Sequence, residues 1–257
     1  MTPKQQGFFF PPEWHPHVAT WLTFPHNEAS WQGNKRHLMY SQYFGLIKAI
    51  SKGEKVGLNV NDETLKNFIL GELPKYEIDL NQIEILVNPT NDAWCRDHGP
   101  AFLINPAAEQ KKVIVDWNYN AWGNKYPPYD LDDVIPTLIG KHFDIPVYHP
   151  GIIMEGGSVD FNGAGTIMTS KSCLLNPNRN PHLNQSQIEK YLCDYYGIDQ
   201  VLWVSDGIVG DDTDGHIDDT VRFVNEDTVI TVIEDNVLSE NHELLQQNLK
   251  ELKQMRL

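Results

Sequence analysis

The feature that most constrains this fold is an internal period of about sixty residues. Phe102, Phe161 and Phe223 hold matching places in three similar segments, at steps of 59 and 62 residues. Each segment contains two β-prone runs joined by a turn or a loop, which is typical of a hairpin. The sequence therefore predicts three repeated hairpins, at Ala101–Asp116, Val159–Thr169 and Val221–Thr231.

The segments upstream of the hairpins repeat as well. Short apolar strands are predicted at Ile83–Val87, Ile145–Tyr148 and Val201–Val204. Helices with apolar residues at i, i+3 and i+4 precede them, at Asp62–Leu70, Leu131–Phe143 and Ser186–Tyr196, and a fourth runs from Ser239 to the end. Ser186 and Glu189 have the spacing of a capping box. Radial repetition of such units favours an α/β propeller, whereas a doubly wound sheet would have longer crossovers and fewer hairpins.

Length and composition narrow the function. The 257 residues allow one large domain or two small ones, and the net charge of −15 argues against a nucleic-acid partner. The acidity would favour a cationic ligand, although it also serves solubility alone. We expect no membrane span and no signal peptide. The three cysteines fit neither a disulfide frame nor a zinc site, so we expect a reducing, cytoplasmic setting.

The most unusual polar residues stand between strand and hairpin in every repeat. Asp97, Glu155 and His216 lie five, six and seven residues before the phenylalanine of their own repeat. Equivalent loops of a radial array point at one axis, so these three side chains are predicted to share a site. Carboxylates match a planar guanidinium, and a histidine supplies acid–base chemistry near neutral pH. Asp218 is expected on the same side of an extended segment as His216.

Each of these residues also has a structural interpretation. Asp97 could form an ion pair with Arg96, and Glu155 could accept backbone N–H groups in a turn. His216 could be a satisfied structural histidine. The carboxylates of Asp211–Asp219 could form a solvated loop or a calcium site, although the EF-hand register is missing. A zinc site lacks a second nearby histidine or cysteine.

At these loops the sequence resembles the agmatine deiminase family, which includes the bacterial-type peptidylarginine deiminases. The resemblance covers nearly the whole chain and rests on Pro11–Leu22, Trp94–Pro100, Trp117–Gly123, Glu155–Gly157, Leu174–Pro181 and Asp212–Asp218. It implies an α/β fold, a five-bladed α/β propeller of the pentein type, with pseudo-symmetric strand, hairpin and helix repeats. The expected domain is a single one over residues 1–257, with its last blade incomplete.

The resemblance also implies a reaction and a role for each residue. A cysteine attacks the guanidinium carbon, ammonia leaves, and water hydrolyses the covalent amidino intermediate; agmatine then becomes N-carbamoylputrescine. Asp97 and Asp218 would hold the guanidinium nitrogens, Glu155 would assist binding, and His216 would transfer protons. No metal or organic cofactor is implied.

The sequence departs from the family at the nucleophile. The family's cysteine follows a Gly-rich stretch near the C-terminus, and no such stretch occurs before Leu257. Cys95 is expected to point away from Asp97 on an extended segment, and Cys173 and Cys193 are expected to be buried and structural. We therefore expect this chain to be inactive alone.

Other functions stay open. Peptidyl-arginine could replace agmatine as the substrate, and without a nucleophile the chain could be a guanidinium- or polyamine-binding protein. A calcium-stabilised domain is a third possibility. Trp94, Trp122 and Asp214 are candidate contacts for the distal end of a substrate, with core packing as the alternative for the tryptophans. Exposed sheet edges would favour a homodimer.

Overall fold

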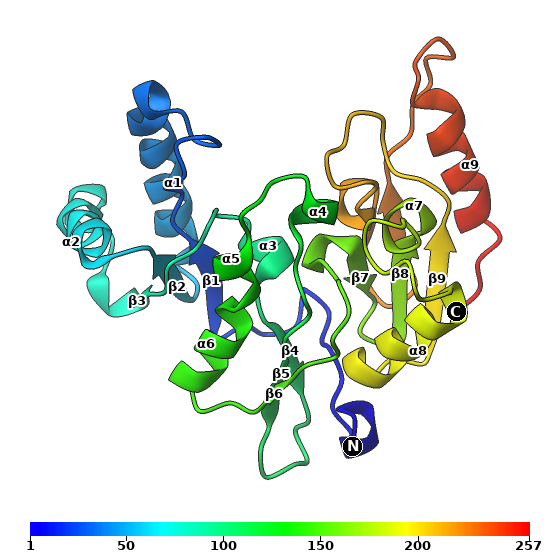
Figure 1. Cartoon of the computed structure of the whole chain (residues 1–257), viewed down its shortest axis with the longest axis horizontal. Coiled ribbons are helices and arrows are strands. Elements are labelled where there is room, and N and C mark those ends of the chain that lie inside the picture. Colours follow the sequence, from blue (N-terminus) through cyan, green and yellow to red (C-terminus); the bar gives the residue numbers. More distant parts are fainter. The chain divides into compact units, whose positions relative to one another are not determined.

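The computed structural model describes the backbone of residues 1–257 and every side chain except those of Asn34, Arg36 and His37. It has a mixed α/β architecture in two compact units (Figure 1). Unit 1 comprises Met1–Trp14, Arg96–Pro127 and Pro136–Leu257, and unit 2 comprises His15–Cys95 and Pro128–Ile135. Throughout the part of the chain that is described, no helix has both the length and the apolar character needed to cross a membrane.

Unit 2 is built on a parallel sheet in the order β1-β2-β3. Its strands are β1 (Ala19–Thr23), β2 (Lys55–Val60) and β3 (Ile83–Val87), and its longer helices are α1 (Arg36–Ile50) and α2 (Glu63–Glu72). Short 3-10 turns complete it: η2 (Gly33–Lys35), η3 (Leu73–Tyr76) and η4 (Leu80–Gln82). The predicted helix at 62–70 and strand at 83–87 are confirmed, whereas β1, β2 and α1 were not predicted.

Unit 1 repeats one sheet plan. An antiparallel hairpin is followed by a third strand that pairs in parallel with the second hairpin strand. The first sheet holds β4 (Ala101–Ile104), β5 (Lys112–Val115) and β6 (Val147–Tyr148), and the second holds β7 (Val159–Phe161), β8 (Thr166–Ser170) and β9 (Gln200–Val204). A third hairpin consists of β10 (Val221–Phe223) and β11 (Val229–Thr231). The three predicted hairpins are therefore present, and the parallel strands begin within two residues of their predicted starts.

The helices of unit 1 correct two details of the prediction. The helix expected at 131–143 is interrupted at Val134. It gives α5 (Asp130–Asp133), which lies within unit 2, and α6 (Ile135–His142), which lies in unit 1 from Pro136 on. Pro136 has no N–H to donate to the preceding turn, which explains the break. The capping box of α8 (Gln185–Tyr196) is formed by Asn184 and Gln187 instead of Ser186 and Glu189. The remaining elements are η1 (Lys4–Gln6), α3 (Cys95–His98), α4 (Ala121–Asn124), η5 (Gly156–Ser158), α7 (Lys171–Leu174), η6 (Ile217–Asp219) and α9 (His242–Leu252).

Buried apolar residues pack next to the ends of the polar loops in unit 1. Phe161, which marks the second repeat, packs against Phe10 and Tyr196 with ring centroids 4.3 and 4.9 Å apart. Ile217, directly after His216, belongs with Val221 and Phe223 to a second buried cluster. Phe161 and Ile217 follow the polar residues Glu155 and His216 closely in the chain, so their packing restrains where these loops lie.

Candidate active site

Asp97 lies in the short helix α3, just before the first hairpin of unit 1. One carboxylate oxygen, Oδ1, accepts the Gly157 N–H at 2.9 Å, and Oδ2 accepts the Trp122 indole N–H at 3.1 Å. Burial raises its pKa to about 6, although these hydrogen bonds oppose the rise. Arg96 does not form the ion pair with Asp97 that the sequence suggested, because its guanidinium binds Asp218 at 3.1 Å and also Glu13.

The Gly156-Gly157 pair lets three loops approach closely. A Cβ on Gly156 would lie 2.0 Å from the Arg96 carbonyl oxygen. A Cβ on Gly157 would lie 2.4 Å from His216 Nδ1, 2.8 Å from Asp97 Oδ1 and 3.0 Å from Asp218 Oδ2. The space at Gly156 and at Gly157 is too small for a side chain unless the neighbouring atoms shift, so glycine is favoured at both positions. The same distances show that Asp97, His216 and Asp218 converge on one point.

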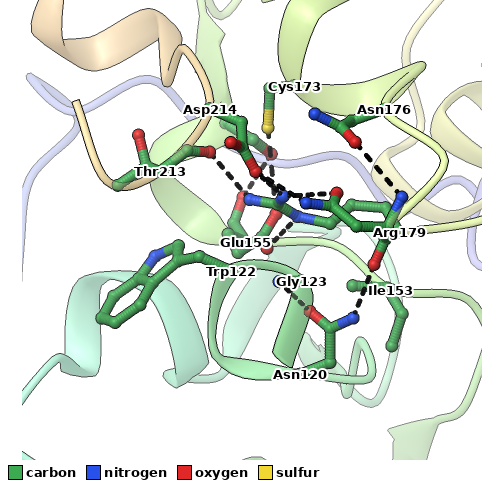
Figure 2. A network of polar contacts seen from close by, with 12 residues as sticks. Asn120, Trp122, Gly123, Ile153, Glu155, Cys173, Asn176, Arg179, Thr213 and Asp214 are labelled. Atoms are coloured by element: carbon green, nitrogen blue, oxygen red, sulfur yellow. Dashed lines mark hydrogen bonds and ion pairs between the residues drawn. The ribbon is translucent and has the colours of Figure 1, made fainter. Parts of the chain in front are cut away.

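Glu155 is fully buried and paired with a buried arginine. Arg179 Nε donates to Glu155 Oε1 at 2.6 Å, and both side chains are inaccessible to solvent. Figure 2 shows the Arg179 guanidinium between Glu155 and the loop of Thr213 and Asp214, which accept two of its other N–H groups. Burial raises the pKa of Glu155, and the arginine charge opposes this. Glu155 is therefore held by Arg179, and its side chain does not accept the backbone N–H groups of the following turn, contrary to what its neighbouring glycines suggested.

His216 and Asp218 come from the third loop. His216 Nδ1 lies 3.6 Å from Asp97 Oδ1 and 3.9 Å from Asp218 Oδ1. The expected extended segment is instead the 3-10 turn η6, so alternation is not what brings the two residues together. Burial lowers the pKa of His216, which keeps its imidazole neutral near neutral pH, and raises the pKa of Asp218. Within the described part of the chain, His216 Nε2 is buried without a hydrogen-bond partner.

The acidic loop before His216 holds itself together. One carboxylate, Asp211, accepts the N–H groups of Thr213 and Gly215, both at 2.8 Å. Asp214, in the left-handed region at φ 68°, binds Arg179, Lys125 and Asn178. These carboxylates are occupied by donors of the protein, so the loop is better explained as a clamp on Arg179 than as a calcium site.

Known proteins include clear relatives of this chain. The profile of the Porphyromonas-type peptidyl-arginine deiminase family matches residues 9–257. The chain belongs to that family. It is 38% identical to a Legionella pneumophila protein provisionally named an agmatine deiminase, over 98% of this chain and 70% of that protein. It is 35% identical to an agmatine deiminase of Pseudomonas syringae pv. tomato, over 87% of this chain and 60% of that protein.

A solved family structure extends the likeness to three dimensions. The agmatine deiminase of Enterococcus faecalis aligns with a TM-score of 0.89 at 32% identity, over 99% of this chain and 68% of that chain. These relatives are longer than this chain, which spans between 60% and 70% of their length.

The three cysteines lie in different surroundings, and the thiol pKa is raised in two of them. Cys173 is fully buried, and burial raises the pKa of its thiol well above its ordinary value. Cys193 is partly exposed, which corrects the expectation of burial, because α8 buries the Ile188, Leu192 and Tyr196 stripe beside it. Cys95 begins the helical turn α3 instead of lying on an extended segment. It belongs to unit 2.

The two tryptophans predicted to contact the substrate, Trp122 and Trp94, both pack or hydrogen-bond within the protein. Trp122 is 7% exposed and adopts φ 55°, a conformation uncommon for a bulky residue, while its indole binds Asp97. Trp94 lies in unit 2, where it stacks on Trp31 with ring centroids 5.5 Å apart. The role of Arg179 was not predicted, although the Leu174–Pro181 motif contains it. Its partner, Glu155, lies 24 residues away in the chain, so no local pattern in the sequence indicates the pair.

Proposed function

We propose that this chain provides the guanidinium-binding and proton-transfer side of an agmatine deiminase. The observation that carries the proposal is Asp97, a buried carboxylate whose two hydrogen-bond donors are the neutral Trp122 indole and Gly157 amide. It lies beside His216 and converges with Asp218 at Gly157. A buried carboxylate without a cation bound directly to it is suited to receive one.

Each group has a role in the proposed reaction. Asp97 and Asp218 accept hydrogen bonds from the guanidinium nitrogens, and the substrate displaces Arg96 from Asp218. Glu155 stays bound to Arg179 and keeps a negative charge near the imidazole. His216 carries the proton of the attacking thiol to the departing nitrogen, which leaves as ammonia. It then takes a proton from the water that attacks the amidino intermediate and returns it to the thiol as the ureido product leaves. Agmatine and water thereby give N-carbamoylputrescine and ammonia.

We further propose that these 257 residues do not catalyse the reaction alone. Nucleophilic attack on the guanidinium carbon requires a thiolate. Cys173 is a buried thiol with a raised pKa, and Cys193 lies on helix α8 with its pKa raised by partial burial. Neither provides a thiolate at neutral pH, and the Cys95 thiol donates to the Trp21 carbonyl oxygen at 3.5 Å. The repeated sheet plan and the likeness to solved agmatine deiminases support the finer proposal of a five-bladed propeller in one domain.

Agmatine and peptidyl-arginine share the guanidinium and differ at the distal end of the molecule. Three probes test which of them the site binds: agmatine, the diamine putrescine without a guanidinium, and Nα-acetyl-arginine amide. We expect calorimetry to detect agmatine binding at the site, weaker binding of the arginine amide, and no competition by putrescine. Replacing Asp97 by Asn should weaken agmatine binding about 10- to 100-fold, the equivalent of one charge-assisted hydrogen bond.

Each contrary outcome identifies another function. Equal affinity for putrescine would indicate a polyamine-binding protein, and tighter binding of the arginine amide would indicate a peptidyl-arginine substrate. Unchanged agmatine affinity in the D97N variant would overturn the assigned site. Ureido product formed by the wild-type chain would refute the proposal that it is inactive alone.

A further inference from the structure

One group of side chains has a geometry that the proposed reaction does not explain. Glu155, Cys173 and His216 each direct one potential metal-ligand atom to a common point, and these atoms all lie within 4.8 Å of one another. Glu155 and His216 precede the 3-10 turns η5 and η6, whereas Cys173 lies in helix α7; the three are 0%, 3% and 0% exposed, respectively. A buried carboxylate, thiol and imidazole form a set of donors suited to a zinc-like cation.

We propose that Glu155, Cys173 and His216 bind a borderline-soft divalent cation such as Zn²⁺. The second observation behind this proposal is His216 Nε2, which is buried and, among the described groups, has no hydrogen-bond partner. The other ring nitrogen, Nδ1, faces Asp97 Oδ1 at 3.6 Å. A carboxylate on the far side of a histidine orients its free nitrogen toward a metal in many proteins.

The surrounding contacts leave the required ligand atoms available. Arg179 Nε donates to Oε1 of Glu155, and three of the other four N–H groups donate to Asp214, Thr213 and Asn178. Glu155 Oε2 faces the Cys173 sulfur at 4.0 Å, a distance that Figure 2 marks with a dashed line. Zinc–ligand distances of about 2.0–2.3 Å require the three ligands to move inward by about 1 Å at most.

The charges allow a cation to bind. Binding breaks the Cys173 S–H bond, forms an S–Zn bond and releases one proton, with no change of oxidation state. Asp97 and Asp218 add negative charge on the imidazole side, which offsets the Arg179 charge. Asp218 is 17% exposed, so an approaching cation meets a carboxylate before it reaches His216.

The consequence for activity rests on the proposed function. Glu155 and His216 would serve both the metal and the guanidinium reaction, so a bound cation would prevent proton transfer by His216. The site would therefore be inhibitory and not a cofactor site. Binding itself does not depend on that function and can be measured without any substrate.

Cobalt provides the direct test. Metal-free 257-residue chain is titrated with Co²⁺ and then with Zn²⁺ as the competitor. We expect one Co²⁺ per chain, a thiolate-to-cobalt charge-transfer band, and loss of the band when Zn²⁺ is added. Replacing Cys173 by Ser should remove the band and weaken Zn²⁺ binding by more than about 100-fold, because losing a ligand costs more than losing an outer-shell partner. The C193S variant is the matched control and should keep the band.

A readout on the wild-type chain covers the case in which C173S does not fold. X-ray absorption of the Zn²⁺-loaded protein should show one sulfur at about 2.3 Å with nitrogen and oxygen at about 2.0–2.2 Å. A shell of nitrogen and oxygen alone would overturn the proposal. So would a cobalt band that persists in folded C173S or disappears in C193S. Failure of agmatine to bind would leave the metal site unaffected.

Discussion

Two buried carboxylates flank His216, and they are satisfied in opposite ways. Glu155 has a permanent cation, because Arg179 Nε lies 2.6 Å from its Oε1. Asp97 receives only neutral donors, Trp122 and Gly157, in its hydrogen bonds. Burial of a charge costs free energy, and it raises the pKa of both carboxyl groups, that of Asp97 to about 6.

The difference separates structural from ligand-binding carboxylates. Glu155 and Arg179 tie the second repeat to the acidic loop of the third, so their pair is part of the framework. Asp97 is left poorly compensated inside that framework. A guanidinium bound to Asp97 would add a directly bound positive charge to the more distant charge of Arg96, which gives binding a favourable electrostatic contribution.

The largest expected effect comes from breaking the permanent pair. Replacing Arg179 by Met leaves the Glu155 carboxylate buried and unpaired, and we expect the free energy of unfolding to fall by about 3–5 kcal/mol. Urea unfolding of the wild type and of R179M measures this loss of stability. Adding Glu155→Gln to this variant should recover much of the loss. The exposed pair of Lys190 and Asp194 offers a control, since K190M should cost less than about 1 kcal/mol. A loss in R179M no larger than in K190M would contradict the framework role.

Asp97 should show the opposite behaviour. Its folded pKa of about 6 exceeds its ordinary value of 3.8, so the folded state binds more protons between these pH values. Stability of the wild type relative to D97N should therefore rise as pH falls from about 7 to 4, by up to about 3 kcal/mol. Unfolding of both variants across this range measures the difference.

Asp214 is a control of opposite sign for this pH dependence. Burial alone would raise its pKa, but hydrogen bonds from Lys125, Asn178 and Arg179 outweigh burial and lower it. The stability of the wild type relative to D214N should therefore fall as pH falls through the ordinary range of an aspartate. Parallel slopes for D97N and D214N would remove the distinction between the two kinds of carboxylate.

A smaller effect is expected from filling the space between the loops. Gly157→Ala places a methyl group within 3.0 Å of three polar side chains, so we expect a loss of stability of about 1–3 kcal/mol and loss of agmatine binding. Gly71→Ala is the control, because a Cβ there meets nothing within 4 Å and α2 should gain about 0.5–1 kcal/mol. Normal agmatine affinity in G157A would show that the three side chains do not bind the guanidinium together.

The sequence predicted what depends on local pattern. The hairpins after Asp97, Glu155 and His216 follow from alternating β-prone runs and turn residues, and the shared phase of the loops placed these residues near one another. Longer-range partners were not predictable: nothing local to Arg179 indicates that it pairs with Glu155, or that Cys173 packs against the same carboxylate. Conformations set by packing also escaped prediction, such as the left-handed Trp122 and the 3-10 turn after His216.

The most direct test of the central claim is the indole N–H resonance of Trp122 during an agmatine titration at pH above 6. This N–H donates to Asp97 at 3.1 Å, so it reports whether a cation binds that carboxylate. The W122F variant assigns the resonance. We predict a saturable shift that is absent in D97N and weakens as pH falls below about 6, the pKa of Asp97. Saturable agmatine binding that leaves this resonance unmoved would show that the guanidinium binds elsewhere.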